Sequence, residues 1–210
     1  KYKKQNKYLI KKKNIFFSIL VYDILPYTNP NWFALKKYKF IFRKYILSLK
    51  IYSQILTISK KVQFDLTNNF KNYFNKKKIN PIKLGSNFGR RFNQDYKKKN
   101  SDNIKFLIVG TLEPRKGHKE IVKIFNNIAE EDFNIELIIV GKLGWKYDDI
   151  LQEITTSKFF NNRLFYYQNL RDYDLTKKYL SCDIVIVPSY DEGFGLPIVE
   201  GINFKKIVLA

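Results

Sequence analysis

The sequence has very few residues of the kinds that form disulfides or bind structural metals. Its 210 residues include one cysteine, Cys182, one histidine, His118, and no methionine. A single cysteine cannot form an internal disulfide, and one cysteine with one histidine cannot supply a Cys/His zinc site. We therefore expect neither a disulfide framework nor a structural metal.

Long apolar runs are also missing. No uninterrupted run approaches the roughly 20 residues of a membrane-spanning helix, and the longest candidate, IFFSILVYDILPY, is interrupted by Asp23 and Pro26. The basic start lacks the small-residue cleavage site of a secretory signal. Because the sequence opens without methionine and stops at Ala210 inside an apolar run, we expect a piece of a longer chain, truncated at both ends.

The composition is globular, but its charge is unevenly distributed. Hydrophobic residues make up 45% and aromatic residues 17% of the chain, which argues against intrinsic disorder. The formal net charge is +20, yet residues 1–105 hold 26 Lys or Arg against 4 Asp or Glu, whereas residues 106–210 hold 13 against 15. This asymmetry indicates two regions with different partners.

Residues 104–210 alternate between strand and helix patterns. Short apolar runs rich in β-branched residues, several closed by glycine, predict strands buried on both faces of a parallel sheet. The strands are expected at 104–110, 134–141, 162–168, 182–189 and 206–210, with helices at 118–131, 145–157, 172–181 and 197–204. In the first of these helices Ile121, Ile124, Phe125 and Ile128 recur at helical spacing. The pattern predicts an open, doubly wound α/β sheet with ligands at the carboxyl ends of its strands.

Residues 1–84 are less periodic but compatible with part of another α/β unit. We expect strands at 15–24, 54–58 and 79–84, with helices at 33–50 and 59–74. Residues 85–103 have few aliphatic side chains and many Gly, Asn, Ser and Lys, as is typical of a linker. The predicted domains are therefore 1–84 and 104–210, joined by a linker at 85–103.

The clearest motif is SYDEGFGLPIVEG, which follows the expected strand DIVIVPS. Gly193 and Gly195 let the backbone approach a ligand, and Pro197 suits the first position of the next helix. The amides at the start of that helix favour an anion such as a diphosphate. Glu192 in the loop and Glu200, expected in the first helical turn, add two carboxylates with seven residues between them.

Carboxylates repel a diphosphate, so these two acids are better suited to accept hydrogen bonds from sugar hydroxyls. One would bind the ribose diol of a nucleotide sugar and the other its donor sugar, while helix amides bind the phosphates. The alternative interpretation is structural: Glu200 is a favourable acid near a helix start, and Gly193, Phe194 and Gly195 form a tight surface turn.

A second motif, VGTLEPRKGH, follows the strand expected at 104–110. It places Arg115 and Lys116 where a doubly wound sheet binds its ligand. Charge-assisted hydrogen bonds from such cations to phosphate contribute about 1.5–3 kcal/mol each. Taken alone, two basic residues in a loop are more often solvated surface, so the argument depends on the two motifs together.

With these motifs the chain resembles the retaining glycosyltransferases of family 4, which have the GT-B architecture of two Rossmann-like domains. EGFGLPIVE matches the family's pattern of two glutamates separated by seven residues, and VGTLEPRKG and IIVGKLGW resemble its first two strands and their loops in the C-terminal domain. VYDILPYTNP, ILTISKKVQFDL and INPIKLG resemble later parts of the N-terminal domain. The resemblance implies that 1–84 is the C-terminal part of an acceptor-side domain and 104–210 a truncated nucleotide-sugar domain.

The resemblance also implies roles for individual residues. Lys116 matches the lysine on the donor diphosphate, Glu200 the acid on the ribose hydroxyls and Glu192 the acid near the donor sugar. The loop whose amides face sugar and phosphate is matched by Gly193, Phe194, Gly195 and Leu196.

Two positions depart from the family pattern. Thr111 stands where an arginine often follows the first glycine, and we expect Arg115 to supply that charge. Tyr22 stands where a histidine often precedes the aspartate, so no role of that histidine is transferred. We expect Arg115, Lys116 and Glu192 to be catalytic and Thr111 to lie in the donor site.

The implied activity is transfer of a sugar, with retention, from a nucleoside-diphosphate sugar to a glycan or lipid-linked acceptor in cell-surface polysaccharide synthesis. GDP-mannose is favoured over UDP-sugars by the EPRK motif, no metal or other cofactor is expected, and closure of the two domains would exclude water. A cytoplasmic location is expected, with the basic half resting on an anionic membrane surface.

Two other functions remain open on the sequence. A nucleic-acid-binding protein would explain the Lys, Tyr and Phe residues interleaved in the basic half, although no recognised nucleic-acid motif accompanies them. A catalytically inactive nucleotide-sugar binder would explain Thr111.

Overall fold

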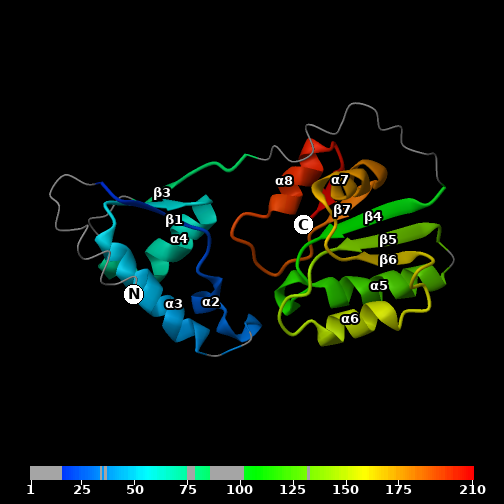
Figure 1. Cartoon of the computed structure of the whole chain (residues 1–210), viewed down its shortest axis with the longest axis horizontal. Helices are drawn as coiled ribbons and strands as arrows, with labels where there is room; N and C mark the ends of the chain where they lie inside the picture. Colours follow the sequence, from blue (N-terminus) through cyan, green and yellow to red (C-terminus); the bar gives the residue numbers. More distant parts are fainter. Residues whose placement is uncertain (1–15, 34, 36, 75–78, 86–101, 132) are drawn as a thin grey trace. The chain divides into compact units, whose positions relative to one another are not determined.

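The computed structural model describes residues 16–33, 35, 37–74, 79–85, 102–131 and 133–210. The chain divides into two compact units, Lys1–Leu84 and Gly85–Ala210 (Figure 1). Most of the predicted linker, residues 86–101, lies outside the described residues.

The first unit is built on a three-stranded parallel sheet in the order β1-β2-β3. Its strands are β1 (Ser18–Val21), β2 (Gln54–Thr57) and β3 (Ile79–Pro81). Its helices are α2 (Leu25–Thr28), α3 (Tyr38–Ser48) and α4 (Lys60–Asn69), with short 3₁₀ turns at Pro30–Trp32, Leu49–Ile51 and Lys71–Tyr73.

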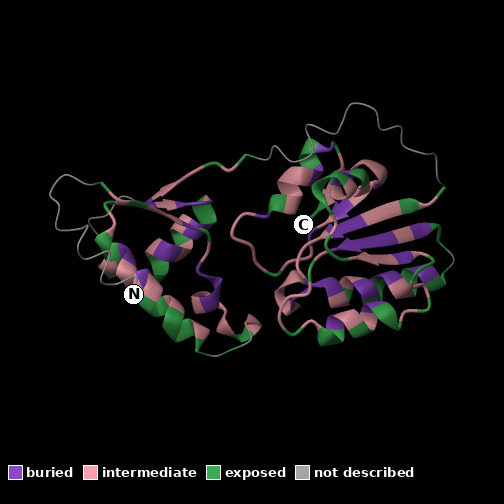
Figure 2. Ribbon diagram, in the orientation of Figure 1, coloured by how far each residue is buried: buried purple, intermediate pink, exposed green. Residues whose placement is uncertain are grey.

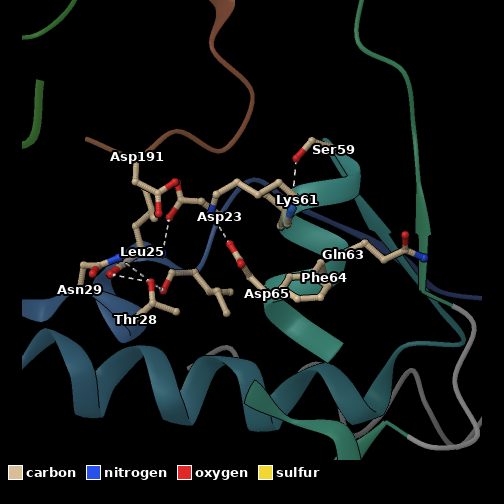
Figure 3. A network of polar contacts seen from close by, with 12 residues as sticks. Asp23, Leu25, Thr28, Asn29, Ser59, Lys61, Gln63, Phe64, Asp65 and Asp191 are labelled. Carbon is tan, nitrogen blue, oxygen red and sulfur yellow. Dashed lines mark hydrogen bonds and ion pairs between the residues drawn. The ribbon is translucent and has the colours of Figure 1, made fainter. Parts of the chain in front are cut away.

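The elements of this unit are shorter than the sequence pattern predicts, and local capping explains two of the differences. After β1 the Asp23 carboxylate accepts a hydrogen bond of 3.0 Å from the Leu25 amide, which turns the chain into α2 (Figure 3). The Ser59 hydroxyl accepts one of 3.1 Å from the Val62 amide and so caps α4. The apolar run that predicted a strand over 15–24 therefore continues into the one-turn helix α2.

The second unit is a five-stranded parallel sheet in the order β6-β5-β4-β7-β8. Its strands are β4 (Ile104–Val109), β5 (Ile135–Val140), β6 (Leu164–Tyr167), β7 (Ile184–Ile186) and β8 (Ile207–Leu209). Its helices are α5 (His118–Glu130), α6 (Asp148–Thr155), α7 (Asp172–Ser181) and α8 (Leu196–Asn203), with a 3₁₀ turn at Pro114–Lys116. Every element predicted here is present, and the doubly wound topology is confirmed.

Helices cover both faces of this sheet (Figures 1 and 2). Alternate strand residues point to opposite faces. Ile108 of β4 and Ile139 of β5 pack with α5 and α6 in one core cluster. Leu107 and Ile138, the neighbouring residues, pack with α7 and the end of α8 in the other.

Helix α5 confirms part of the predicted apolar stripe, because Phe125 is buried and Ile121 packs against the core, but two of its isoleucines face solvent. Ile124 is 52% and Ile128 39% exposed. The buried residues of the helix are His118, Val122, Phe125 and Ala129. The apolar residues of the helix form one stripe, and the sheet covers the side of that stripe that holds Val122, Phe125 and Ala129, so Ile124 and Ile128 lie at its exposed edge.

No helix within the described ranges is long and apolar enough to cross a membrane.

The close packing of β4 against β5 at their carboxyl ends leads to a prediction for Gly141. A Cβ atom at this position would lie 1.8 Å from the Gly110 carbonyl oxygen, a backbone atom that cannot move aside without disturbing the sheet. We expect Gly141→Ala to lower the free energy of unfolding by about 3 kcal/mol or more, measured by urea denaturation. Gly85→Ala is the matched control because nothing lies within 4 Å of its Cβ position; equal stabilities of the two variants would contradict the prediction.

A second prediction concerns the buried His118. Burial, and next the charge of Lys116, lower the pKa of His118 to about 4. An ordinary histidine titrates near pH 6.5 in the unfolded chain, so the unfolded state gains a proton first and stability falls as the pH drops from 7 to 5. Because His118 is the chain's one histidine, we expect His118→Gln to remove about 2 kcal/mol of that loss. Urea denaturation of the wild type and of the variant at pH 7 and pH 5 measures the loss of unfolding free energy. Equal losses in the two proteins would contradict the prediction.

Candidate functional site

Two loops meet at the carboxyl ends of β4 and β7. These strands are neighbours in the sheet, with Leu107 paired to Val185. The loops touch through their backbones: the Tyr190 amide donates to the Arg115 carbonyl at 2.9 Å. Gly117 has φ 65° and lies so near Pro188 that a Cβ would be 2.3 Å from the Pro188 carbonyl oxygen. Glycine at this position lets the two loops approach each other.

Arg115 bridges the two loops. Its Nε lies 2.6 Å from the Glu113 carboxylate in an ion pair. Its Nη1 donates to the Asp191 carbonyl at 3.1 Å and to Glu192 Oε2 at 3.4 Å. The side chain is 15% exposed, so the guanidinium is held mainly by protein groups.

Lys116 and Glu192 form a second ion pair across the same loops. The Lys116 ammonium contacts Glu192 Oε1, which also accepts a hydrogen bond of 2.7 Å from the Ser189 hydroxyl. Both side chains are mostly buried. A basic pair from the β4 loop and an acid from the β7 loop therefore meet in one cluster.

The two acids of this cluster differ in proton affinity. Burial alone would raise the pKa of Glu192, but hydrogen bonds from Lys116 and Ser189 and the positive charge of Arg115 hold that pKa below its usual value. Burial raises the pKa of Glu113 despite the opposing charge of Arg115. The two carboxylates therefore differ in how far neighbouring donors and cations offset the cost of burial.

Thr111 lies outside this cluster. Its methyl group packs toward Gly144, where a Cβ atom would be 2.7 Å from Thr111 Cγ2. The structure therefore places Thr111 against the loop that follows β5, and its place in the donor site stays a prediction.

The glycine loop, formed by Gly193, Phe194 and Gly195, leads directly into α8. Gly195 precedes the helix with φ 81°, a left-handed conformation that favours glycine. Leu196 is the first helical residue and is 48% exposed. No side chain caps this end of the helix. Pro197 has no N–H and the Ile198 amide donates to the Gly195 carbonyl at 3.0 Å, so an anion at this end would meet the Leu196 amide.

Glu200 lies deeper in α8 than the sequence suggests. The helix begins at Leu196, one residue before Pro197, so Glu200 starts the second turn and no acid lies in the first. Glu200 Oε2 accepts a hydrogen bond of 2.6 Å from the Tyr179 hydroxyl. Burial, and next the charge of Asp172, raise the pKa of Glu200, while the Tyr179 hydrogen bond opposes that rise.

Arg115, Lys116 and Glu192 are thus brought together, whereas Glu200 is hydrogen-bonded to a core tyrosine. Sequence reasoning missed Glu113, Ser189 and Tyr179. Glu113 stands beside Arg115 in the EPRK motif, but no local signal predicts that its side chain is buried. No sequence motif marks Tyr179, because it is one of many aromatic residues in the chain.

Metal ligands do not cluster in the part of the chain that the structure describes: no group of three or more His, Cys, Asp or Glu could hold an ion there.

A shallow pocket of about 380 Å³ lies beside the end of β6 and is lined by Tyr167, Leu170, Asp174, Lys177, Lys178 and Ser181. Leu170 belongs to the segment between β6 and α7, which therefore forms part of the pocket wall. Lys178 covers the Tyr167 ring at 3.7 Å.

The chain is similar to bacterial sugar transferases. It is 29% identical over 209 residues to the serotype-specific mannosyltransferase WbdA of Escherichia coli, covering 92% of this chain but 26% of WbdA. The chain thus spans about a quarter of the length of that relative.

Solved structures agree on the fold. Sucrose-phosphate synthase from Thermosynechococcus elongatus matches with a TM-score of 0.68 at 17% identity, over 96% of this chain and 51% of that one. Anabaena HepE in complex with UDP-glucose matches with a TM-score of 0.66 at 20% identity, over 91% and 52%. These similarities confirm the expected α/β fold class, the GT-B architecture of two Rossmann-like units.

The family comparison covers the second unit, which carries the ion-pair cluster and the glycine loop. The family model described as "Glycosyl transferases group 1" matches residues 89–210, more than half of the chain. The chain therefore belongs to the glycosyl transferases of group 1.

Proposed function

We propose that this chain is part of a retaining glycosyltransferase that transfers a hexose from a nucleoside-diphosphate sugar to a glycan or lipid-linked acceptor in cell-surface polysaccharide synthesis. GDP-mannose is the favoured donor, because the relatives include O-antigen mannosyltransferases. The observation that carries the proposal is the meeting of Arg115 and Lys116 with the glycine loop before α8, at the edge where a doubly wound sheet binds its ligand.

In this proposal the diphosphate binds to the cations and to the Leu196 amide at the start of α8. The two cations are neutralised by Glu113 and Glu192 within the protein. An incoming diphosphate competes with Glu192 for Lys116 and Arg115, which releases the Glu192 carboxylate toward the donor sugar. Glu113, at 2% exposed, stays with Arg115.

Bond cleavage at the anomeric carbon leaves negative charge on the departing nucleoside diphosphate. Arg115, Lys116 and the Leu196 amide are donors already fixed in place for that charge, and one such donor contributes about 3–4 kcal/mol of barrier reduction. No metal is required in this scheme. Glu200 would accept hydrogen bonds from the ribose hydroxyls.

Binding of nucleoside diphosphates tests the donor site. We expect one of GDP, UDP and ADP, with GDP favoured, to bind with micromolar affinity in isothermal titration calorimetry. Glu200→Gln should weaken that binding by about 10- to 100-fold, because a charge-assisted hydrogen bond contributes about 1.5–3 kcal/mol.

Glu131→Gln is the control, since Glu131 is exposed at the far end of α5. Absence of binding by any of the three nucleotides to folded protein would show that the donor site is wrongly assigned. It would also turn attention to the nucleic-acid alternative, which the group 1 match does not favour.

For the location we propose the cytoplasmic face of a membrane, with the basic first unit on anionic lipid. Helix α3 presents exposed Lys39, Arg43 and Lys44 together with Phe40, which is 60% exposed. Between Asp23 and Asp65 the sequence contains no acidic residue. Basic and aromatic groups side by side are suited to the interface of an anionic bilayer.

Vesicle sedimentation tests this surface. We expect the protein to bind vesicles containing about 30% phosphatidylglycerol and not vesicles of phosphatidylcholine alone. Replacing Lys39, Arg43 and Lys44 with Gln should lower the partition coefficient by about 100-fold, because each charge near the surface contributes about 1 kcal/mol.

The control replaces three exposed lysines of the second unit, Lys123, Lys158 and Lys205, with Gln. Equal losses in the two triple variants would mean that net charge alone drives binding, against the proposed surface.

A further inference from the structure

The Glu200 carboxylate is fixed by a group that belongs to the hydrophobic core. Tyr179 lies on α7 and is fully buried, and its hydroxyl donates to Glu200 Oε2 at 2.6 Å. Glu200 itself is half-buried on α8. A buried donor on one helix therefore holds a partly accessible acceptor on the next.

The Tyr179 ring has little freedom to move. It stacks on Phe204 with ring centroids 5.0 Å apart and an interplanar angle of 10°. The same core cluster contains Leu107 of β4 and Val185 of β7. The position of the hydroxyl is thus set by the packing of α7 and α8 on the sheet.

The hydrogen bond from Tyr179 occupies only part of the hydrogen-bond acceptor capacity of the Glu200 carboxylate. An ionised carboxylate offers about four lone-pair sites, and Tyr179 occupies one of them on Oε2. Within the described ranges no other side chain or amide donates to the Glu200 carboxylate. Burial, with the charge of Glu200 next, raises the pKa of Tyr179, so its hydroxyl keeps its proton and remains a donor.

We propose that Tyr179 is a positioning residue for nucleotide recognition: its hydroxyl holds one oxygen of Glu200 and so directs the other oxygen to the ribose hydroxyls of the donor. This inference rests on the proposed function. It assigns a specificity role to a residue that does not itself touch the ligand. The contribution of the Tyr179 hydroxyl should then depend on whether the ligand carries a ribose diol.

The test compares GDP with 2′,3′-dideoxy-GDP, or the corresponding UDP pair if UDP is the nucleotide that binds. Calorimetry on the wild-type chain should give about a 30-fold preference for the nucleotide with both hydroxyls. Tyr179→Phe keeps the ring and its stacking on Phe204 and should reduce that preference at least fivefold. Affinity for the dideoxy nucleotide should change less than twofold.

Two further variants separate positioning from a general structural effect. Tyr166→Phe is the matched control, because it also removes a tyrosine hydroxyl, one that donates to the Gly141 carbonyl at 2.9 Å; it should leave the preference unchanged. Glu200→Asp keeps the charge but withdraws the carboxylate from Tyr179, and should lower the preference as Tyr179→Phe does. This second variant provides the test if Tyr179→Phe does not fold.

The outcomes are distinguishable. A wild-type chain that binds neither nucleotide contradicts the proposed function and this inference with it. A wild-type chain that prefers the diol, with the same preference in folded Tyr179→Phe, overturns the positioning role alone. If Tyr179→Phe weakens both nucleotides equally, its role is structural and the inference is also overturned.

Discussion

The parallel pairing of β4 with β7 is the contact on which the candidate site depends. Residues on these strands are far apart in the chain, yet Phe106 pairs with Ile184 in the sheet. β5 and β6 extend the sheet on one side of this pair and β8 on the other. The connections therefore diverge at this point, which is where a doubly wound sheet generally binds its ligands. Every charged contact between the two loops follows from that pairing.

Charge compensation between the two loops explains why their basic residues can lie mostly buried. Taking a charge out of water is costly unless a partner of opposite sign lies nearby. Here Glu113 and Glu192 offset Arg115 and Lys116. Under the proposed function the two acids behave differently when the donor binds. Phosphate replaces Glu192 on the cations, whereas Glu113 stays paired with Arg115. With Glu192 on the cations, two acids balance two cations.

The hydrophobic core and the candidate site are connected through α7 and α8. Tyr179 belongs to the core cluster that includes Leu107 and Val185, and its hydroxyl lies on Glu200. Gly201, next along α8, brings this helix close to the sheet: a Cβ there would lie 2.9 Å from Val208 Cγ2. Core packing therefore sets how far the Glu200 carboxylate stands from the glycine loop.

The sequence alone determined the doubly wound topology of the second unit, because buried parallel strands and the helices between them have distinct periodicities. It also located the glycine loop, the two glutamates and the basic pair, since local chemistry marks them. Tertiary structure decided which of these residues meet. The pairing of Lys116 with Glu192, the burial of Glu113, the hydrogen bond from Tyr179 to Glu200 and the inner face of α5 all depend on strand order and helix packing. These long-range contacts leave no periodic signal in the chain.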